Sequence, residues 1–207
     1  MKKSEATRQH ILETGRKLIA EQGFSSMGLS LLLKTAGVPK GSFYHYFESK
    51  EHFGCVLVQQ YIDEYMATLD SLLEPGELTY REKLFSYWSR WKTTQHAEDT
   101  SKHCLIVKLS AEIADSSEDI RELMVQLANK VETRLGDIIE AGIQDGSIAP
   151  GVDPKVSAQL LYQMWLGASL IAKLTREKKP FYRALEFTEI LLPAAPSQIH
   201  NTNTPVP

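Results

Sequence analysis

Cysteine is scarce in this chain, with only Cys55 and Cys104 among its 207 residues. Two isolated cysteines give neither a disulfide framework nor the spacing of a metal site, and they suit a reducing compartment. The chain also lacks an apolar run of the ~20 residues that span a bilayer, and its start, MKKSEATRQH, has no apolar core of a signal peptide. We therefore expect a cytoplasmic protein with no metal and no contact with a membrane.

Motifs of common catalytic sites are also lacking. The sequence contains no G-x-S-x-G elbow, no H-E-x-x-H pair, no glycine-rich phosphate loop and no dinucleotide fingerprint. We therefore expect no catalytic residue and no cofactor, which leaves an enzyme of unknown chemistry as a remote alternative. A DNA-packaging role without sequence preference is disfavoured too, because such proteins are strongly basic and this chain carries a net charge of −3.

The stretch from Leu29 to Phe47 is typical of two short helices joined by a tight turn. Its leucines recur at helical spacing until Ala36-Gly37 ends the first helix, and the second helix starts near Lys40. Phe43 and Phe47 lie four positions apart and face inward, so the polar side chains between them point elsewhere. The candidates for contact with a phosphate-lined groove of DNA are Lys40, Gly41, Ser42, Tyr44, His45 and Lys50.

Charge is distributed unevenly along the chain. Residues 1–54 hold eight Lys or Arg against five Asp or Glu, a net charge of +3, whereas the rest of the chain carries −6. Attraction to phosphate acts over a Debye length of about 8 Å, so the local charge matters more than the overall charge. The basic N-terminal part is therefore compatible with binding to DNA.

The block GFSSMGLSLLLKTAGVPKGSFYHYFESKE resembles the DNA-binding head of the TetR family of bacterial one-component transcriptional repressors. It departs from the family pattern at Pro39, where the family usually has Ser or Thr as the cap of its recognition helix. The resemblance implies an all-α fold of about nine helices, with a three-helix helix-turn-helix domain in residues 1–50 and a helical sensing and dimerisation domain in residues 51–192. The Pro-, Asn- and Thr-rich residues 193–207 are expected to form a disordered tail.

Capping residues mark where the other helices begin and end. Thr7 is a candidate cap for the first helix and Gly23 its stop, while Ser49 is a candidate cap for the fourth. Ser116 and Asp119 form a box-like start for a long helix. Beyond the fourth helix, the pattern predicts helices at residues 80–95, 101–113, 116–142, 155–179 and 181–192.

The segment KVSAQLLYQMWLGASLIAKL is apolar almost all round, which indicates burial on more than one side. The family dimerises through its last two long helices. The resemblance thus implies a homodimer interface at residues 156–174 and 181–192, with Gly167, Ala168 and Ser169 allowing close approach. A two-fold dimer reads two half-sites about 34 to 36 Å apart, so a palindromic operator in double-stranded DNA is the expected partner. The alternative is that this helix is the centre of a monomer's core.

The stretches HCLIVKLSAEI and YQMWLGASLIAKL resemble the subgroup of the family that responds to reactive electrophiles and oxidants, with Cys104 at the position of the sensing thiol. In the first turn of a helix, its thiolate would face unpaired N–H groups, with His103 and Lys108 as cationic neighbours. These influences raise the thiolate fraction above the ~3% of a free thiol at pH 7. The alternative is a small buried side chain that only packs, which is the role expected for Cys55 among its apolar neighbours.

Lys173 is an unusual cation in an otherwise apolar segment. It shares a helical face with Tyr162 and Ser169. Its side chain either extends to the surface or borders the sensing pocket, where it would pair with a modified thiol or an anionic ligand.

Aromatic residues of the predicted sensing domain are the remaining candidates for detecting a signal. They are either core or the lining of a pocket for an apolar effector, and they comprise Trp88, Trp91, Tyr162 and Trp165. The sequence therefore predicts a repressor that leaves its operator when a small-molecule electrophile or oxidant modifies Cys104. Release by reversible binding of an apolar small molecule is the alternative.

Overall fold

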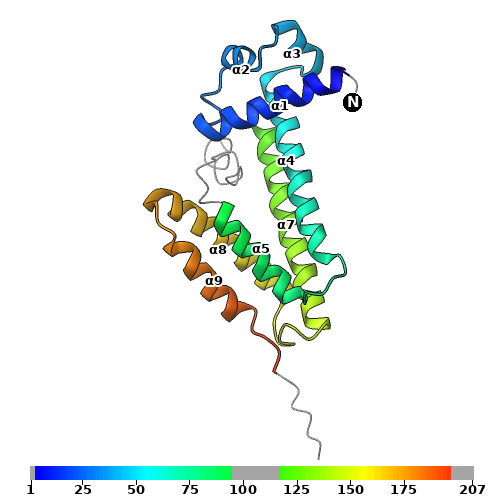
Figure 1. Cartoon of the computed structure of the whole chain (residues 1–207), viewed down its shortest axis with the longest axis vertical. Coiled ribbons are helices and arrows are strands. Elements are labelled where there is room, and N and C mark those ends of the chain that lie inside the picture. Colours follow the sequence, from blue (N-terminus) through cyan, green and yellow to red (C-terminus); the bar gives the residue numbers. More distant parts are fainter. Residues whose placement is uncertain (1–2, 95–116, 197–207) are drawn as a thin grey trace, which may run out of the picture.

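The computed structural model describes residues 3–94 and 117–196 (Figure 1). These residues form eight helices and no strand, which confirms the predicted all-α class. The helix predicted at residues 101–113 and its cysteine, Cys104, lie outside the described residues. The helices are α1 Lys3–Gln22, α2 Leu29–Ala36, α3 Lys40–Tyr46, α4 Lys50–Leu73, α5 Tyr80–Thr94, α7 Glu118–Gln144, α8 Pro154–Thr175 and α9 Lys179–Leu191.

Helices α1, α2 and α3 form a head at one end of the molecule, around the start of α4 (Figure 1). Gly37 ends α2 with φ of 65°, a left-handed conformation that glycine adopts without strain, and α3 begins at Lys40 as predicted. The rings of Phe43, Phe47 and Phe53 pack together with centroids 5.1 to 5.8 Å apart, and all three side chains are buried. Because Phe53 belongs to α4, the core of the head includes the first turn of that helix.

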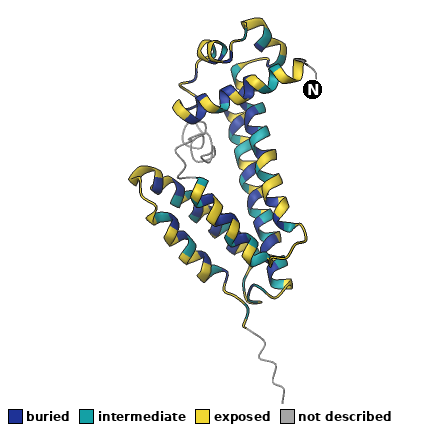
Figure 2. Cartoon of the chain, viewed as in Figure 1, coloured by how far each residue is buried: buried dark blue, intermediate teal, exposed yellow. Residues whose placement is uncertain are grey.

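The body begins with α4 and α7, which run side by side away from the head (Figure 1). Near the head the two helices are joined through Glu51 and Ser117, and further along through Asp70 and Arg134, whose charged atoms lie 2.8 Å apart. Helices α5, α8 and α9 pack beside them, and the buried residues line the faces that these helices turn toward one another (Figure 2). Of the described helices, none combines the length and the apolar content that crossing a bilayer requires.

Two predicted helix starts were wrong by a few residues. Helix α1 begins at Lys3, so Thr7 lies inside it and does not cap it, because the residues before Thr7 are acceptable in a helix and extend it. Helix α7 is capped by Ser117, one residue after Ser116, and the Ser117 hydroxyl accepts from the Ile120 N–H. Of two adjacent serines, the second also contacts Glu51, which selects it as the cap.

The tail predicted from residue 193 onward begins with paired residues. The Ala149 N–H donates to the Pro193 carbonyl oxygen over 2.9 Å, and Ile148 pairs with Ala194 in an isolated antiparallel bridge. These contacts join the loop between α7 and α8 to the chain that follows α9, next to Leu192, which is fully buried. The chain is therefore anchored for two residues beyond the predicted boundary.

Asp145, just after α7, holds the start of α5. Its carboxylate accepts from the backbone N–H groups of Tyr80 and Ser147, each over 2.9 Å. Partial burial opposes the charge, but the hydrogen bonds from Ser147 and Tyr80 keep the pKa of Asp145 below its usual value. A lowered carboxyl pKa stabilises the fold above the pKa of the unfolded chain, and this contribution is lost as pH falls through the folded pKa.

We predict that the substitution Asp145→Ala lowers the melting temperature at pH 7 by about 3 to 6 °C, since two hydrogen bonds worth about 1 to 2 kcal/mol in total are removed. The difference from the parent protein should shrink as pH falls below about 4 and through the lowered pKa of the folded carboxylate, because the parent then becomes protonated. Thermal unfolding followed by circular dichroism at several pH values measures both effects. Glu77→Ala, a change at an exposed carboxylate in the α4–α5 connection, is the control. A deficit that persists unchanged at about pH 3 would contradict the assignment to the ionised carboxylate.

Candidate DNA interface and sensing body

Helix α3 presents its polar side chains on the outer side of the head. It has only seven residues, and Pro39 precedes it without a side-chain cap hydrogen bond. Phe43 is fully buried, whereas Tyr44 is 48% exposed. Among the candidate DNA contacts, Lys40, Gly41, Tyr44 and His45 are exposed, and Ser42 and Lys50 are half-buried. The six residues therefore lie on or beside one short helix at the end of the head that is remote from α8 and α9 (Figure 1).

Two of the candidate lysines lie over aromatic rings. The Lys40 ammonium is 5.7 Å from the centre of the Tyr44 ring, and the Lys50 ammonium is 4.8 Å from the centre of the Phe24 ring. Burial lowers the pKa of Lys50 from its usual value. Lys40 is thus an exposed cation on α3, and Lys50 is partly covered at the junction between the head and α4.

Helix α1 contacts both α2 and α3. His10 places its Nε2 atom 3.0 Å from the carbonyl oxygen of Ala36, at the end of α2. The hydroxyls of Ser4 and Tyr46 lie 3.2 Å apart, so the start of α1 contacts the end of α3. These contacts join residues far apart in the sequence, and no local pattern signals them.

The aromatic candidates in the body pack mainly on one another. The rings of Trp88 and Trp165 stack with centroids 4.6 Å apart and an angle of 8° between their planes. The indole of Trp91 donates to the Ser169 hydroxyl over 3.0 Å, and that of Trp165 donates to the Thr188 hydroxyl over 3.1 Å. All four predicted pocket residues, including Tyr162, are buried, so they form core between α5, α8 and α9.

Trp88 differs from the other two tryptophans in its polar atom. Its Nε1 is buried and has no hydrogen-bond partner among the residues that the structure describes. A buried N–H without an acceptor is costly, so this atom is a candidate donor to a bound molecule.

The proposed sensing thiol is not among the described residues, and neither are His103 and Lys108. Lys173 is exposed in the last turn of α8, while Tyr162 and Ser169 on the predicted shared face are buried. Ser169 turns inward to Trp91 and Trp165, so the prediction that it contributes to close approach between subunits was wrong. Gly167, by contrast, is exposed, and a Cβ placed on it would meet nothing within 4 Å.

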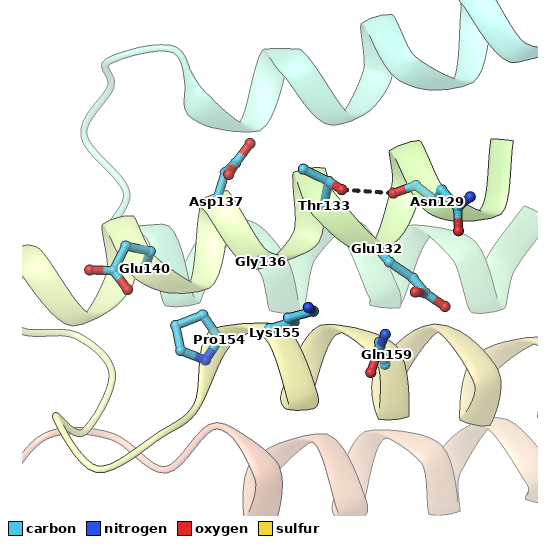
Figure 3. Close-up of a pocket in the computed structure, with 9 residues that line it drawn as sticks. All are labelled: Asn129, Glu132, Thr133, Gly136, Asp137, Glu140, Pro154, Lys155 and Gln159. Carbon is cyan, nitrogen blue, oxygen red and sulfur yellow. Dashed lines mark hydrogen bonds between the residues drawn. The ribbon is translucent and has the colours of Figure 1, made fainter. Parts of the chain in front are cut away.

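A groove of about 510 Å³ lies between α7 and α8, where no sequence pattern predicts one (Figure 3). Its side chains are mainly polar or charged, and they include Glu132, Glu140, Lys155 and Gln159. A second groove of about 490 Å³, between α8 and α9, has apolar residues such as Met164, Ile171 and Phe187. The second groove therefore suits contact with apolar groups better than the first.

An apolar face covers the outer side of α8 and α9. Its large apolar side chains are between 46% and 71% exposed in the isolated chain, with Leu174 at the upper end. They are Val156, Leu160, Leu170, Ile171, Leu174, Tyr182, Phe187 and Ile190. The other side of α8 is buried within the chain, so apolar residues lie on both sides of this helix, and burial of its outer side stays a prediction.

Cys55 lies on α4 and is half-buried. Burial raises the pKa of its thiol, and the negative charges of Asp119 and Glu51 raise it further. The thiolate is therefore disfavoured, which agrees with the packing role expected from the apolar sequence context.

Comparison with known proteins identifies the class of this chain. Residues 11–53 match the family described as "Bacterial regulatory proteins, tetR family", and residues 81–188 match "Tetracyclin repressor-like, C-terminal domain". The chain belongs to the TetR family of transcriptional regulators, with a helix-turn-helix head that binds DNA.

Among its relatives, the chain is 44% identical to the HTH-type transcriptional repressor NemR of Escherichia coli, over 86% of this chain and 90% of the relative. It is 31% identical to the HTH-type transcriptional repressor DhaR of a Mycobacterium species, over 90% of this chain and 93% of the relative. The crystal structure of the reduced form of E. coli NemR superposes with a TM-score of 0.86 at 42% identity, covering 93% of this chain and 99% of that one.

The raised pKa of Cys55 predicts slow alkylation. In a Cys104→Ser variant, in which Cys55 is the remaining cysteine, iodoacetamide should react several-fold more slowly than with a free thiol at about pH 8, because fewer thiolates are present. The rate should continue to rise above about pH 9, where a free thiol is already mostly ionised. Mass spectrometry of samples quenched over time measures the rate, and the denatured variant is the control. Equal rates in the folded and denatured protein would contradict the assigned environment.

Proposed function

We propose that this chain is a homodimeric repressor that binds a palindromic operator and leaves it when an electrophile or oxidant modifies Cys104. The observation that carries the proposal is the 44% identity to the transcriptional repressor NemR over most of both chains. The name of the solved relative specifies a reduced form, which suits a protein whose redox state matters. A repressor acts where the operator is, in the cytoplasm, and a sequence with only two cysteines, of which Cys55 is a free thiol, suits that reducing compartment.

The head supplies the operator contacts in this proposal. Lys40 and Lys50 neutralise phosphates, while Tyr44 and His45 approach base edges or sugars in the major groove. Gly41 allows the backbone of α3 to come close to the DNA, and the hydroxyl of Ser42 donates a hydrogen bond to a DNA phosphate. The support is their common position on or beside α3 and the exposure of four of the six.

The apolar face of α8 and α9 supports dimerisation. Eight large apolar side chains are exposed on the adjacent helices α8 and α9, and such exposure favours a surface that another protein covers. A second copy of the chain meets this face in a two-fold arrangement, in which the exposed Gly167 permits close helix approach. Two heads at a fixed separation then match two half-sites of the operator.

Modification of Cys104 changes this separation. A thousandfold loss of operator affinity requires about 4 kcal/mol of preference for the released conformation, which a new covalent bond and local repacking can supply. His103 and Lys108 favour the thiolate, and Lys173 is the cation that would pair with the modified group. Without modification, the operator-bound arrangement persists.

A second candidate mechanism is reversible binding of an apolar molecule beside Trp88, Trp91, Tyr162 and Trp165. The observation that favours it is the buried Trp88 Nε1, which lacks an acceptor among the described residues. An apolar molecule with one carbonyl oxygen would satisfy that donor, provided that the stacked indoles separate to admit it.

The DNA contacts are tested with an operator recovered by in vitro selection with the full-length protein. Lys40→Ala should weaken binding at least about five- to tenfold and reduce the slope of log affinity against log salt by about 2, because each of the two subunits loses one phosphate contact. Tyr44→Ala should weaken binding to the operator more than binding to random DNA. Fluorescence anisotropy over a range of salt concentrations measures these effects, with Glu77→Ala as the control. Unchanged affinity in both variants would exclude α3 as the reading helix.

The thiol mechanism is tested by the Cys104→Ser variant. It should bind the operator as the parent does and stay bound in the presence of a quinone or an aldehyde, whereas Cys55→Ser should be released like the parent. Gel-shift titration gives the dose required for release. If Cys104→Ser is released at the same dose, the thiol is not the sensor. In that case, stabilisation of the same variant in a thermal-shift screen would support the reversible mechanism.

A further inference from the structure

We propose that Ser117 is a positioning residue for operator binding, acting through Glu51 on the first turn of α4. This inference rests on the proposed function, since it concerns how the DNA-binding head is held. Ser117 precedes α7 at the point where that helix begins beside the head (Figure 1). It is only 8% exposed.

The Ser117 hydroxyl donates one hydrogen bond and accepts another. Its O–H donates to the carboxylate of Glu51 over 2.5 Å, and its oxygen accepts from the N–H of Ile120 over 3.4 Å. The second bond caps α7, which any good cap residue can do. The first bond joins α7 to α4 across 66 positions in the sequence, and it requires a donor.

The contact lies where the head meets the body. Glu51 follows Lys50, whose ammonium lies over the ring of Phe24 in the head. One turn further along α4, a Cβ placed on Gly54 would lie 2.7 Å from Phe24 and 2.9 Å from Ile120 of α7. Atoms of the head, α4 and α7 therefore touch with no spare room, and a shift of α7 is transmitted to the head.

The same site carries a concentration of negative charge. Glu51 lies four positions before Cys55 on α4, and besides burial the negative charges of Asp119 and Glu51 raise the pKa of the Cys55 thiol. The Ser117 hydroxyl is the donor that holds Glu51 in this acidic setting. A carboxylate at position 117 would still cap α7 but would repel Glu51.

This difference separates a positioning role from a capping role. Asn at position 117 accepts from Ile120 and donates to Glu51, whereas Asp accepts only. Aspartate and asparagine are equally good caps and have almost the same shape. If Ser117 acts only as a cap, the two variants behave alike. If it positions α4, they differ in operator affinity.

The route to the head also matches the order of the chain. Cys104 precedes Ser117 by thirteen positions, so the segment that carries the proposed sensing thiol joins α7 at this residue. The head continues covalently into the first turn of α4. The start of α7 packs against that turn and is covalently linked to the segment that carries Cys104.

The experiment is a double-mutant cycle on operator affinity with the full-length protein. Ser117→Asn should bind within about twofold of the parent. Ser117→Asp should bind about tenfold more weakly or worse, with a melting temperature close to that of the Asn variant. In a Glu51→Gln background, Ser117→Asp should cost less than about twofold, because the Gln amide donates to the new carboxylate. The cycle removes the general effect of added charge on DNA binding, which is the same in both backgrounds.

Ser117→Ala provides a second, uncharged test and should bind about threefold more weakly than Ser117→Asn. The reverse cap change Asp153→Ser at the start of α8, where the Asp carboxylate accepts from the Val156 N–H, is the matched control and should leave affinity unchanged. Equal costs of Ser117→Asp with and without the Glu51→Gln substitution would overturn the proposal. So would affinity losses that follow the melting temperatures across all variants. A parent protein that binds operator no better than random DNA would instead overturn the proposed function.

Discussion

The proposed reading helix, α3, depends on the burial of Phe43 against Phe47 and Phe53. A helix of seven residues is not stable by itself in water, so α3 exists because tertiary packing holds it. Phe53 lies in α4, and its ring fills the space left by Gly15 of α1, where a Cβ would lie 2.3 Å from the ring. The head and the first turn of α4 therefore share one packed core, so the proposed DNA-reading surface is joined to the body through α4.

Much of the head was predictable because its signals are local. Phenylalanines four positions apart, the turn at Gly37 and the cap at Ser49 each act within a few residues, and the structure has all three as expected. The predictions failed where contacts between distant residues decide the outcome. Ser117 rather than Ser116 caps α7, in contact with Glu51, and no pattern around either serine contains that information.

The body shows the same limit for the candidate site. The sequence named Trp88 and Trp165 as core or pocket, but it did not predict that their rings stack, because the two residues belong to different helices. The groove between α7 and α8 was missed for the same reason, since Glu132 and Gln159 become neighbours only when the helices pack. Ser169 was assigned to the subunit surface from its small size. Its hydroxyl instead accepts from the Trp91 indole and donates to the Trp165 carbonyl oxygen inside the chain.

All three tryptophans of the chain, Trp88, Trp91 and Trp165, lie in α5 and α8, and the head contains none. Intrinsic fluorescence excited at the red edge of absorption consequently comes from the body alone. The near-parallel indoles of Trp88 and Trp165 are close enough for their transitions to couple, which gives this pair its own signature in near-ultraviolet circular dichroism. The molecule thus contains a built-in optical reporter of its C-terminal half that does not respond directly to events at the helix-turn-helix head.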